Sequence, residues 1–248
     1  MNSTRRLFSL AIASPLALTL ASCSDEADGA AEADTIAPVE APEGTDWNET
    51  VTVSDVNGYV LGNPDAPIKL VEYASHTCGA CANFSQTAKP EIKDYVATGT
   101  VSFEQREVFL NTFDVIIAAL VQCGPKERMQ PLSDEVWGDL GEVMQGVQAN
   151  PQAIEAAGSL PLEQRFVEIA ETADMIDFFA ARGLSADQAR ECLTNADGIE
   201  AMVRNADANS QAVGITGTPT FLLNGEKVDA RQWPELEPML QRAGARQE

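Results

Sequence analysis

The sequence predicts an α/β protein in which a block of helices interrupts a small sheet, and three observations indicate this class. A β-prone apolar run at 68–73 leads through a few small polar residues into a helical segment at 78–96. A second strand-like run at 101–109 precedes a long stretch, 114–204, with helical periodicity and breaks at Gly and Pro. A hairpin and a last helix follow. The predicted order is therefore strand, helix, strand, helical block, hairpin, helix.

Size and charge narrow the possible functions. The chain has 248 residues, with 38 acidic and 16 basic side chains and a net charge of −22. This length can bury a sizeable core as one large domain or two small ones. The acidic excess argues against binding to nucleic acid or adsorption onto anionic lipid. We interpret it as a solvated surface that keeps the protein soluble, in preference to a dedicated acidic binding face.

The first 22 residues predict an export signal. Arg5 and Arg6 precede an apolar run at 7–20, which is too short and wrongly flanked for a membrane-spanning helix. The tetrapeptide Leu-Ala-Ser-Cys that ends at Cys23 resembles a bacterial lipobox, so we expect lipidation of Cys23. The alternative is a secreted protein in which this cysteine is incidental. Residues 4–8 also resemble a twin-arginine signal, so the export route stays open.

A tether and a divided domain are expected after the signal. Residues 23–46 are rich in Ala, Asp, Glu, Pro and Gly, which predicts a disordered acidic tether. Folding signals begin near Trp47, and two short strands, 51–53 and 59–61, flank an Asn-Gly turn. We place the first part of the sheet domain at 47–112, the helical insertion at 113–213 and the second part at 214–248.

The remaining elements follow from periodicity and turn signals. Within the insertion, helices are expected at 114–123, 132–148, 162–182, 186–193 and 198–213. Pro90 is expected to kink the helix at 78–96. After the insertion, an Asn224-Gly225 hairpin turn joins short strands at 220–223 and 227–228, and a last helix spans about 232–243.

Two cysteines three residues apart, Cys78 and Cys81, mark the candidate site. Side chains at i and i+3 of a helix's first turn lie on one face, close enough to form a disulfide or to hold one metal. Free backbone N–H groups at a helix start stabilise negative charge, which favours a thiolate at Cys78. We therefore expect Cys78 to be the nucleophile and Cys81, one turn further in, to be the resolving thiol.

This arrangement of strand, loop, Cys-x-x-Cys and helix resembles the active site of the thioredoxin superfamily. The residues Val-Glu-Tyr-Ala-Ser at 71–75 and Gly-Thr-Pro-Thr-Phe at 217–221 make the chain similar to the DsbA-like branch of secreted thiol-disulfide oxidoreductases, over roughly 59–244. The resemblance implies a thioredoxin fold with an inserted all-helical domain. It also implies a redox-active Cys78–Cys81 disulfide in place of a separate cofactor.

The resemblance implies roles for further residues. Glu72 matches the position of a buried acid beneath the resolving cysteine, where it would exchange a proton with Cys81; a solvated, edge-facing Glu is the alternative. Pro219 would be a cis proline facing the cysteines, with the backbone of Thr218 pairing with substrate; an ordinary trans proline is the alternative. His76 is expected near the thiolate on the substrate-binding face, where it would favour the thiolate when protonated, or would simply decorate the rim.

Cys123 and Cys192 remain once the other cysteines are assigned. An even remainder in an exported protein suggests a structural disulfide, with two buried free thiols as the alternative. A zinc site built from all four cysteines, or from cysteines with His76, is less favoured because the two pairs lack finger-like spacing. We expect no metal site.

The function implied by the resemblance is disulfide exchange, with oxidation favoured, on unfolded or reduced exported proteins at the periplasmic side of a bacterial membrane. A membrane quinone-linked, DsbB-like oxidase would be the redox partner, and we expect a monomer. Gly79-Ala80 replaces the Pro-His commoner in the family, which predicts a milder oxidant. The alternatives are a reductase or isomerase on the same scaffold and, from another class, a tethered metal-binding module or holdase.

Overall fold

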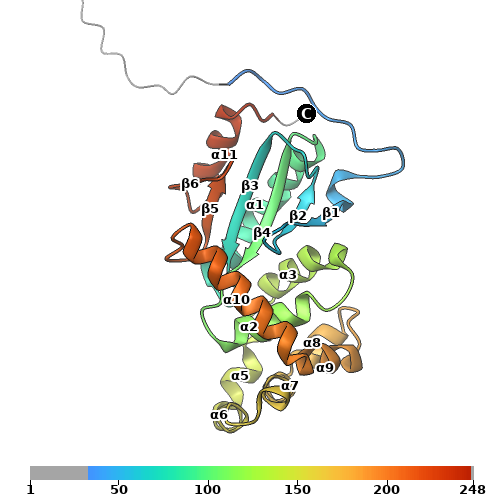
Figure 1. The fold of residues 1–248 in the computed structure, drawn as a ribbon, viewed down its shortest axis with the longest axis vertical. Helices are drawn as coiled ribbons and strands as arrows, with labels where there is room; N and C mark the ends of the chain where they lie inside the picture. The colour runs from blue at the N-terminus through green and yellow to red at the C-terminus, as the bar shows by residue number, and fades with distance from the viewer. Residues whose placement is uncertain (1–32, 247–248) are drawn as a thin grey trace, which may run out of the picture. The chain divides into compact units, whose positions relative to one another are not determined.

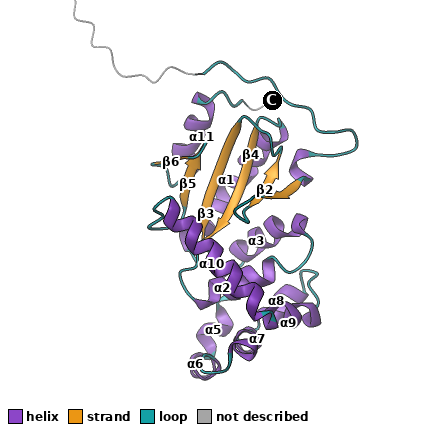
Figure 2. Ribbon diagram, in the orientation of Figure 1, coloured by secondary structure: helices purple, strands orange, loops and turns teal. Residues whose placement is uncertain are grey.

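The computed structural model describes residues 33–246, which contain a six-stranded mixed sheet in the order β1-β2-β4-β3-β5-β6 (Figures 1 and 2). The central strands β3 and β4 are parallel, in register from Ile68 opposite Val101 to Ala74 opposite Glu107. Every other neighbouring pair is antiparallel. The strands are β1 (Val51–Val53), β2 (Tyr59–Gly62), β3 (Ile68–Ala74), β4 (Val101–Glu107), β5 (Thr220–Leu223) and β6 (Glu226–Val228).

The central strand β3 is apolar because it is buried on both faces. All of its residues except Lys69 are buried, and β4 and β5 pair with its two edges. A parallel partner requires a crossover, which α1 (Gly79–Ala97) provides between β3 and β4. The strand and helix predicted at 68–73 and 78–96 are therefore confirmed to within one residue at each end, and the helix continues through Pro90.

One face of the sheet is covered by α1 together with α11 (Trp233–Arg242). Phe84 and Ile92 of α1 and Leu236 of α11 belong to the same buried cluster as Leu70 and Phe221 of the sheet. Phe84 also contacts Phe221 ring to ring, with centroids 4.5 Å apart. This packing holds the start of α1 rigidly at the carboxyl end of β3.

The helical insertion follows β4 and builds a hydrophobic core of its own. An Asp174 in the left-handed region, with φ 58°, divides the helix expected at 162–182. The helix expected at 132–148 is likewise divided into three. The insertion consists of α2 (Thr112–Val121), α3 (Met129–Gly138), α4 (Leu140–Val143), α5 (Gln145–Ala149), α6 (Pro151–Ala157), α7 (Leu162–Thr172), α8 (Met175–Ala180), α9 (Ala186–Thr194) and α10 (Ala196–Ala212).

The described part of the expected tether is docked on the sheet domain, so the prediction of disorder is wrong for residues 33–46. Ile36 N–H donates to Gly244 O at 3.0 Å and Val39 N–H donates to Thr98 O at 2.8 Å. Ile36 also packs against the core cluster under the sheet. Gly99 and Gly244 have positive φ and let the segment approach closely, because a Cβ at either position would clash with its backbone. Cys23 and the signal at 1–22 lie outside the described residues.

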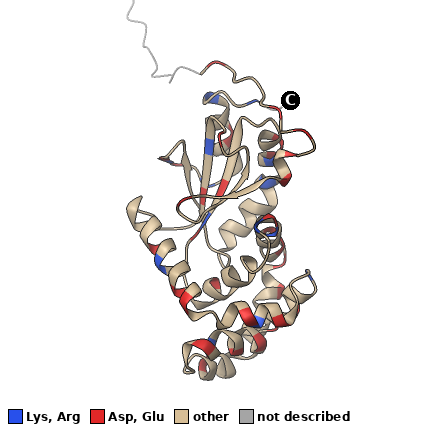
Figure 3. Ribbon diagram, turned by 45° about the vertical axis from the view of Figure 1, so that its right-hand side comes forward, with Lys and Arg blue, Asp and Glu red and all other residues tan. Residues whose placement is uncertain are grey.

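Acidic side chains are found on both parts of the fold (Figure 3). Figure 3 shows Asp and Glu on the helices of the insertion as well as on the sheet domain, which fits a solvated acidic surface. Among residues 33–246, no helix combines the length and the apolar character needed to cross a membrane.

Candidate active site

Cys78 is the N-cap residue of α1, where β3 has just ended and the loop 75–77 turns the chain. Its backbone is extended, with φ −83° and ψ 115°, and its Sγ accepts a hydrogen bond from Cys81 N–H at 3.4 Å. The first N–H groups of a helix have no partner within the helix, so a sulfur at this position takes the place of a capping oxygen. The helix begins one residue later than predicted because Cys78 caps it.

A prolyl turn from the far end of the chain lies against Cys78. The Thr218-Pro219 peptide bond is cis, as the resemblance implies. Cys78 Sγ lies 3.4 Å from Thr218 O, a contact between residues 140 positions apart. The two halves of the predicted site are therefore adjacent in space.

The surroundings of Cys78 favour its thiolate. Partial burial on its own raises the pKa of the thiol, but hydrogen bonding with the Thr218 side chain and with the N–H groups of Cys81 and Ala80 outweighs it, so the pKa lies below its usual value. Gly79 and Ala80 are exposed and offer no polar side chain. Of the two, Ala80 acts on the sulfur, and it does so through its backbone N–H.

Cys81 has the opposite environment. It is fully buried and packs with Ala74, Ala82 and Trp137. Burial raises the pKa of its thiol strongly, and the nearby Glu72 carboxylate raises it further. The two thiols of the motif are therefore unequal: Cys78 is the accessible one that ionises readily, and Cys81 is the protected one that holds its proton.

Glu72 is fully buried in β3, opposite Gln105 of β4 and Phe221 of β5. Neither carboxylate oxygen has a hydrogen-bond partner. Burial raises its pKa from 4.5 to about 7, although the ammonium of Lys89 acts in the opposite direction. The solvated alternative is wrong. A carboxyl group with this pKa can give up or take up a proton near neutral pH.

Lys89 is a buried residue of this site that the sequence analysis missed. It is 4% exposed, and its Nζ lies 2.5 Å from Asp134 Oδ1 and 3.4 Å from Gln105 Oε1. The ammonium also lies over the Trp137 ring, 4.7 Å from the centroid. The sequence contains an indication of this position. Lys89 is eight residues after Cys81, about two helical turns, and so falls on the same buried face of α1.

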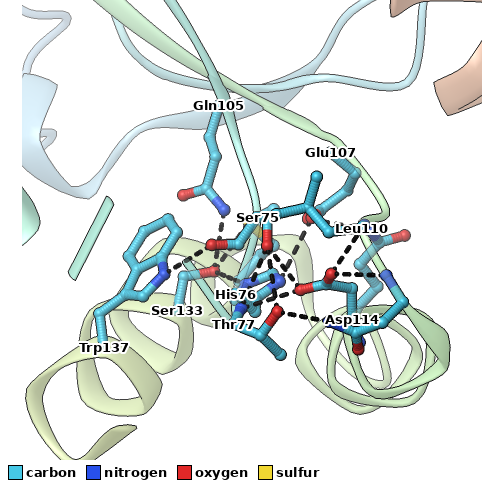
Figure 4. A network of polar contacts seen from close by, with 12 residues as sticks. Ser75, His76, Thr77, Gln105, Glu107, Leu110, Asp114, Ser133 and Trp137 are labelled. Atoms are coloured by element: carbon cyan, nitrogen blue, oxygen red, sulfur yellow. Dashed lines mark hydrogen bonds and ion pairs between the residues drawn. The ribbon is translucent and has the colours of Figure 1, made fainter. Parts of the chain in front are cut away.

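His76 is placed differently from the prediction. It is fully buried, its ring stacks on Trp137, and its Nε2 hydrogen-bonds Ser133 Oγ at 2.9 Å (Figure 4). Its Nδ1 lies 3.3 Å from Glu107 Oε2. The predicted substrate-binding position is therefore wrong, because the side chain turns away from solvent toward Ser133 of α3 and Glu107 of β4. With both ring nitrogens facing these groups, His76 is not positioned to share a metal with the cysteines.

The other two cysteines form the predicted structural disulfide. Cys123 follows α2 and Cys192 lies in α9, with their Cα atoms 6.0 Å apart and a sequence separation of 69. The alternative of two free thiols is wrong. Within residues 33–246, no group of three or more His, Cys, Asp or Glu side chains is arranged to hold a metal ion.

Comparisons with known proteins agree with this geometry. A family model described as Thioredoxin matches residues 54–242. A Rickettsia bellii protein, provisionally named a protein-disulfide oxidoreductase, is 25% identical over 176 residues, which are 71% of this chain and 60% of the relative. The curated Rickettsia relatives are longer, and this chain spans between 54% and 60% of their length.

The fold resembles solved structures from Novosphingobium aromaticivorans and Wolbachia pipientis, among others. The protein-disulfide isomerase from Novosphingobium aromaticivorans superposes with a TM-score of 0.68 and 26% identity, over 73% of this chain and 94% of that one. Wolbachia pipientis alpha-DsbA1 gives a TM-score of 0.61 over 77% of this chain and 93% of its own, at 20% identity, and so shows the fold alone. With its family model covering most of the sequence, the chain belongs to the thioredoxin family.

Proposed function

We propose that this protein is a thiol-disulfide oxidoreductase that exchanges disulfides with exported proteins through Cys78 and Cys81. The observation that carries the proposal is the position of Cys78 Sγ, which caps α1 and contacts Thr218 of the cis-prolyl turn while Cys81 stays buried. An accessible sulfur with a lowered pKa beside a protected partner thiol is the arrangement that disulfide exchange requires.

In the oxidising direction, a substrate thiolate attacks Cys78 Sγ of the Cys78–Cys81 disulfide. The bond between the cysteines breaks, a mixed disulfide forms at Cys78, and Cys81 leaves with the electron pair. A second substrate thiolate then attacks the substrate sulfur of the mixed disulfide, and Cys78 leaves as a thiolate stabilised at the start of α1. Two electrons have moved from the substrate to the cysteine pair, and the substrate holds a new disulfide.

Glu72 supplies the proton that these reaction steps need in the protein interior. The Cys81 thiolate forms in a fully buried setting, where negative charge is costly. Glu72 lies close enough for its charge to raise the pKa of Cys81, and its own pKa of about 7 lets it carry a proton at neutral pH. We assign Glu72 to protonate Cys81 as it leaves and to accept that proton again when the enzyme is reoxidised.

Substrate would approach from the side of the prolyl turn. Thr218 O already contacts Cys78, so an extended polypeptide that pairs with the Thr218 backbone would bring its own cysteine to the same sulfur. Gly79 and Ala80 leave this approach open, because a Cβ at Gly79 would meet no atom within 4 Å. Reduced or unfolded polypeptides fit this site best, since pairing requires extended backbone.

The sequence supports the remaining parts of the proposal. The signal and lipobox at 1–23 favour lipid anchoring through Cys23 at the periplasmic side of a bacterial membrane. Oxidation of clients would then require reoxidation by a membrane partner of the DsbB-like, quinone-linked kind. A monomer suffices for this chemistry, because both cysteines, Glu72 and the prolyl turn come from one chain.

A reductase or isomerase is the second candidate, and the Gly79-Ala80 dipeptide favours it. Neither side chain can add charge or a hydrogen bond to the thiolate, so the disulfide should be a milder oxidant than in relatives with polar groups there. The Novosphingobium aromaticivorans neighbour is named an isomerase, which is in keeping with this candidate.

Equilibration of the Cys78–Cys81 pair with glutathione buffers, followed by trapping of free thiols and mass measurement, tests the proposal. The same protein is then assayed for oxidation of a reduced two-cysteine client, for insulin reduction and for repair of a scrambled client. We expect a reversible two-electron transition and client oxidation by the oxidised form. A pair that does not exchange with glutathione contradicts the proposal, whereas a strongly reducing potential with insulin reduction favours the second candidate.

A further inference from the structure

The loop between β3 and the nucleophile, residues 75–77, is hydrogen-bonded to the helical insertion at several points, and one buried carboxylate makes two of these bonds. Asp114, in the first turn of α2, is fully buried. Its Oδ1 accepts hydrogen bonds from Ser75 Oγ at 2.7 Å and from Thr77 N–H at 2.8 Å. Figure 4 shows this carboxylate between the loop and α2.

The other oxygen of Asp114 has a separate, local task. Asp114 Oδ2 accepts from Leu110 N–H at 2.8 Å and from Asn111 N–H at 3.2 Å, which completes the capping box at the start of α2. Capping therefore accounts for Oδ2 only. The two bonds at Oδ1 join a helix of the insertion to residues 37 and 39 positions earlier in the chain.

The same loop sets the start of α1. Cys78 N–H donates to Ser75 O at 3.2 Å, and Trp137 Nε1 of α3 donates to that same carbonyl at 3.1 Å. Ser75 is thus held at its hydroxyl by Asp114 and at its carbonyl by Trp137, and it holds the backbone of Cys78 in turn. A displacement of this loop would move the sulfur relative to the N–H groups of α1 and to Thr218.

We propose that Asp114 is a positioning residue for Cys78: through Oδ1 it fixes the loop 75–77 so that the sulfur stays at the N-cap of α1 and against Thr218. The inference rests on the proposed role of Cys78 as the nucleophile and extends it. It gives the helical insertion a part in the reactivity of a cysteine that belongs to the sheet domain.

The test is Asp114→Asn in the reduced, full-length protein, with the rate of Cys78 alkylation measured against pH. The Asn side chain keeps the shape of Asp, but only one of its two terminal atoms accepts hydrogen bonds. Two of the four groups that donate to the Asp114 carboxylate therefore lose their acceptor. Removing a negative charge would by itself lower the pKa of Cys78. We expect the opposite, a rise, with the alkylation rate at pH 6 falling about threefold to tenfold, because the thiolate loses its placement against Ala80, Cys81 and Thr218.

Two further variants make the result decisive. Asp187→Asn removes an exposed first-turn carboxylate from α9 of the same insertion and should leave the alkylation profile unchanged. Ser75→Ala removes one of the two bonds at Oδ1 and should shift the profile in the same direction as Asp114→Asn, by less. Should Asp114→Asn fail to fold, Ser75→Ala decides alone.

Thermal unfolding separates positioning from a merely structural role. If Asp114→Asn and Ser75→Ala melt earlier while the pH profile of Cys78 matches the wild type, the carboxylate only stabilises the fold and the proposal is overturned. A lowered pKa of Cys78 overturns it as well. Alkylation uses no client protein, so a failure of the proposed exchange activity would appear separately, as a wild-type protein that alkylates normally but does not exchange disulfides.

Discussion

The two cysteine pairs of this protein have the same side chains but lie in different surroundings. Cys78 and Cys81 share the first turn of one helix, and both are free thiols in the structure. Cys123, which follows α2, and Cys192, in α9, are 69 positions apart in sequence and are bonded. The first pair has a partly exposed member beside a prolyl turn, with a buried acid near its other member. The second pair joins elements of one hydrophobic core.

On the proposed function, placement, rather than the presence of a disulfide, separates a reactive pair from a structural one. Cys78 has backbone N–H groups that stabilise the thiolate it becomes when it leaves. Cys123 is instead packed against the core of the insertion, where its exposed fraction is 9%. We therefore expect substitutions at the first pair to change chemistry and substitutions at the second pair to change stability.

The largest effect is expected from Cys78→Ala. Removal of the attacking sulfur should lower the rate of client oxidation by at least about 10³-fold, as for other enzymes that lose their nucleophile. Because the residue is partly exposed, the fold should remain intact, which circular dichroism would verify. An oxidation assay with a reduced two-cysteine client measures the loss. Residual exchange that depends on Cys81 alone would contradict the assignment of Cys78 as nucleophile.

Cys81→Ala should stop turnover at a different step. Without Cys81 the enzyme disulfide cannot form, so client oxidation stops. The Cys78 thiolate can still attack a disulfide-bonded client, whose other sulfur leaves as a thiolate, but no second enzyme thiol is present to release that client. Mixed disulfides should therefore accumulate and be visible on a non-reducing gel as species that disappear with reductant. If no mixed species forms while Cys78 remains reactive to alkylation, the role of Cys81 as the resolving thiol is wrong.

The paired change Cys123→Ser with Cys192→Ser tests the other side of the comparison. Loss of a cross-link between residues 69 apart should lower the free energy of unfolding by about 4 kcal/mol in the chain-entropy account. Denaturant unfolding measures this loss, and client oxidation by the folded variant should stay within about twofold of the wild type. A folded variant that no longer exchanges disulfides would show that this pair takes part in the chemistry.

Glu72→Gln should change how stability depends on pH. The pKa of Glu72 is about 7 in the folded state against 4.5 as its ordinary value, so the folded protein binds a proton that the unfolded chain releases. The contribution of Glu72 to the free energy of unfolding is present in full below pH 4.5 and is lost as the pH rises through 7. Relative to Glu72→Gln, the reduced wild type should therefore lose about 3 kcal/mol between pH 4 and pH 8.

Urea unfolding at the two pH values measures that difference for Glu72. The variant Glu163→Gln, which neutralises an exposed carboxylate of α7, controls for a general effect of charge. A constant difference between wild type and Glu72→Gln at both pH values would show that the pKa of Glu72 is the same in the folded and unfolded states. This result would contradict the assignment of Glu72 as the group that exchanges a proton with Cys81.

The sheet and the reactive pair could be predicted because their signals are local. The run at 68–73 is apolar because β3 is buried on both faces, and Asn224-Gly225 forms its turn because both residues adopt positive φ, 51° and 87°. The cis-prolyl contact depended on the family resemblance, since no local pattern joins Pro219 to Cys78.

Other features depend on contacts that no local pattern contains. His76 was misplaced because its environment comes from residues of β4 and α3 that lie distant in sequence. Asp114 was absent from the predicted site although its capping box with Asn111 is a visible signal, because a capping box explains the residue without its second task. The docking of 33–46 was missed because it rests mainly on backbone hydrogen bonds, which composition does not show.

The smallest effect, and the finest test of the comparison, is expected from Ala80→His. Ala80 is exposed one position before Cys81, so a new side chain there displaces no packed group. An imidazolium near the Cys78 thiolate would add the charge that the Gly79-Ala80 dipeptide lacks, lower the pKa of Cys78 and stabilise the reduced form. The pair should then become more oxidising, with its equilibrium against glutathione shifted about fivefold to tenfold, or roughly 20–30 mV. Ala80→Gln, which adds bulk without charge, should shift it less, and an equal shift from both variants would mean that charge beside Cys78 does not set the potential of this pair.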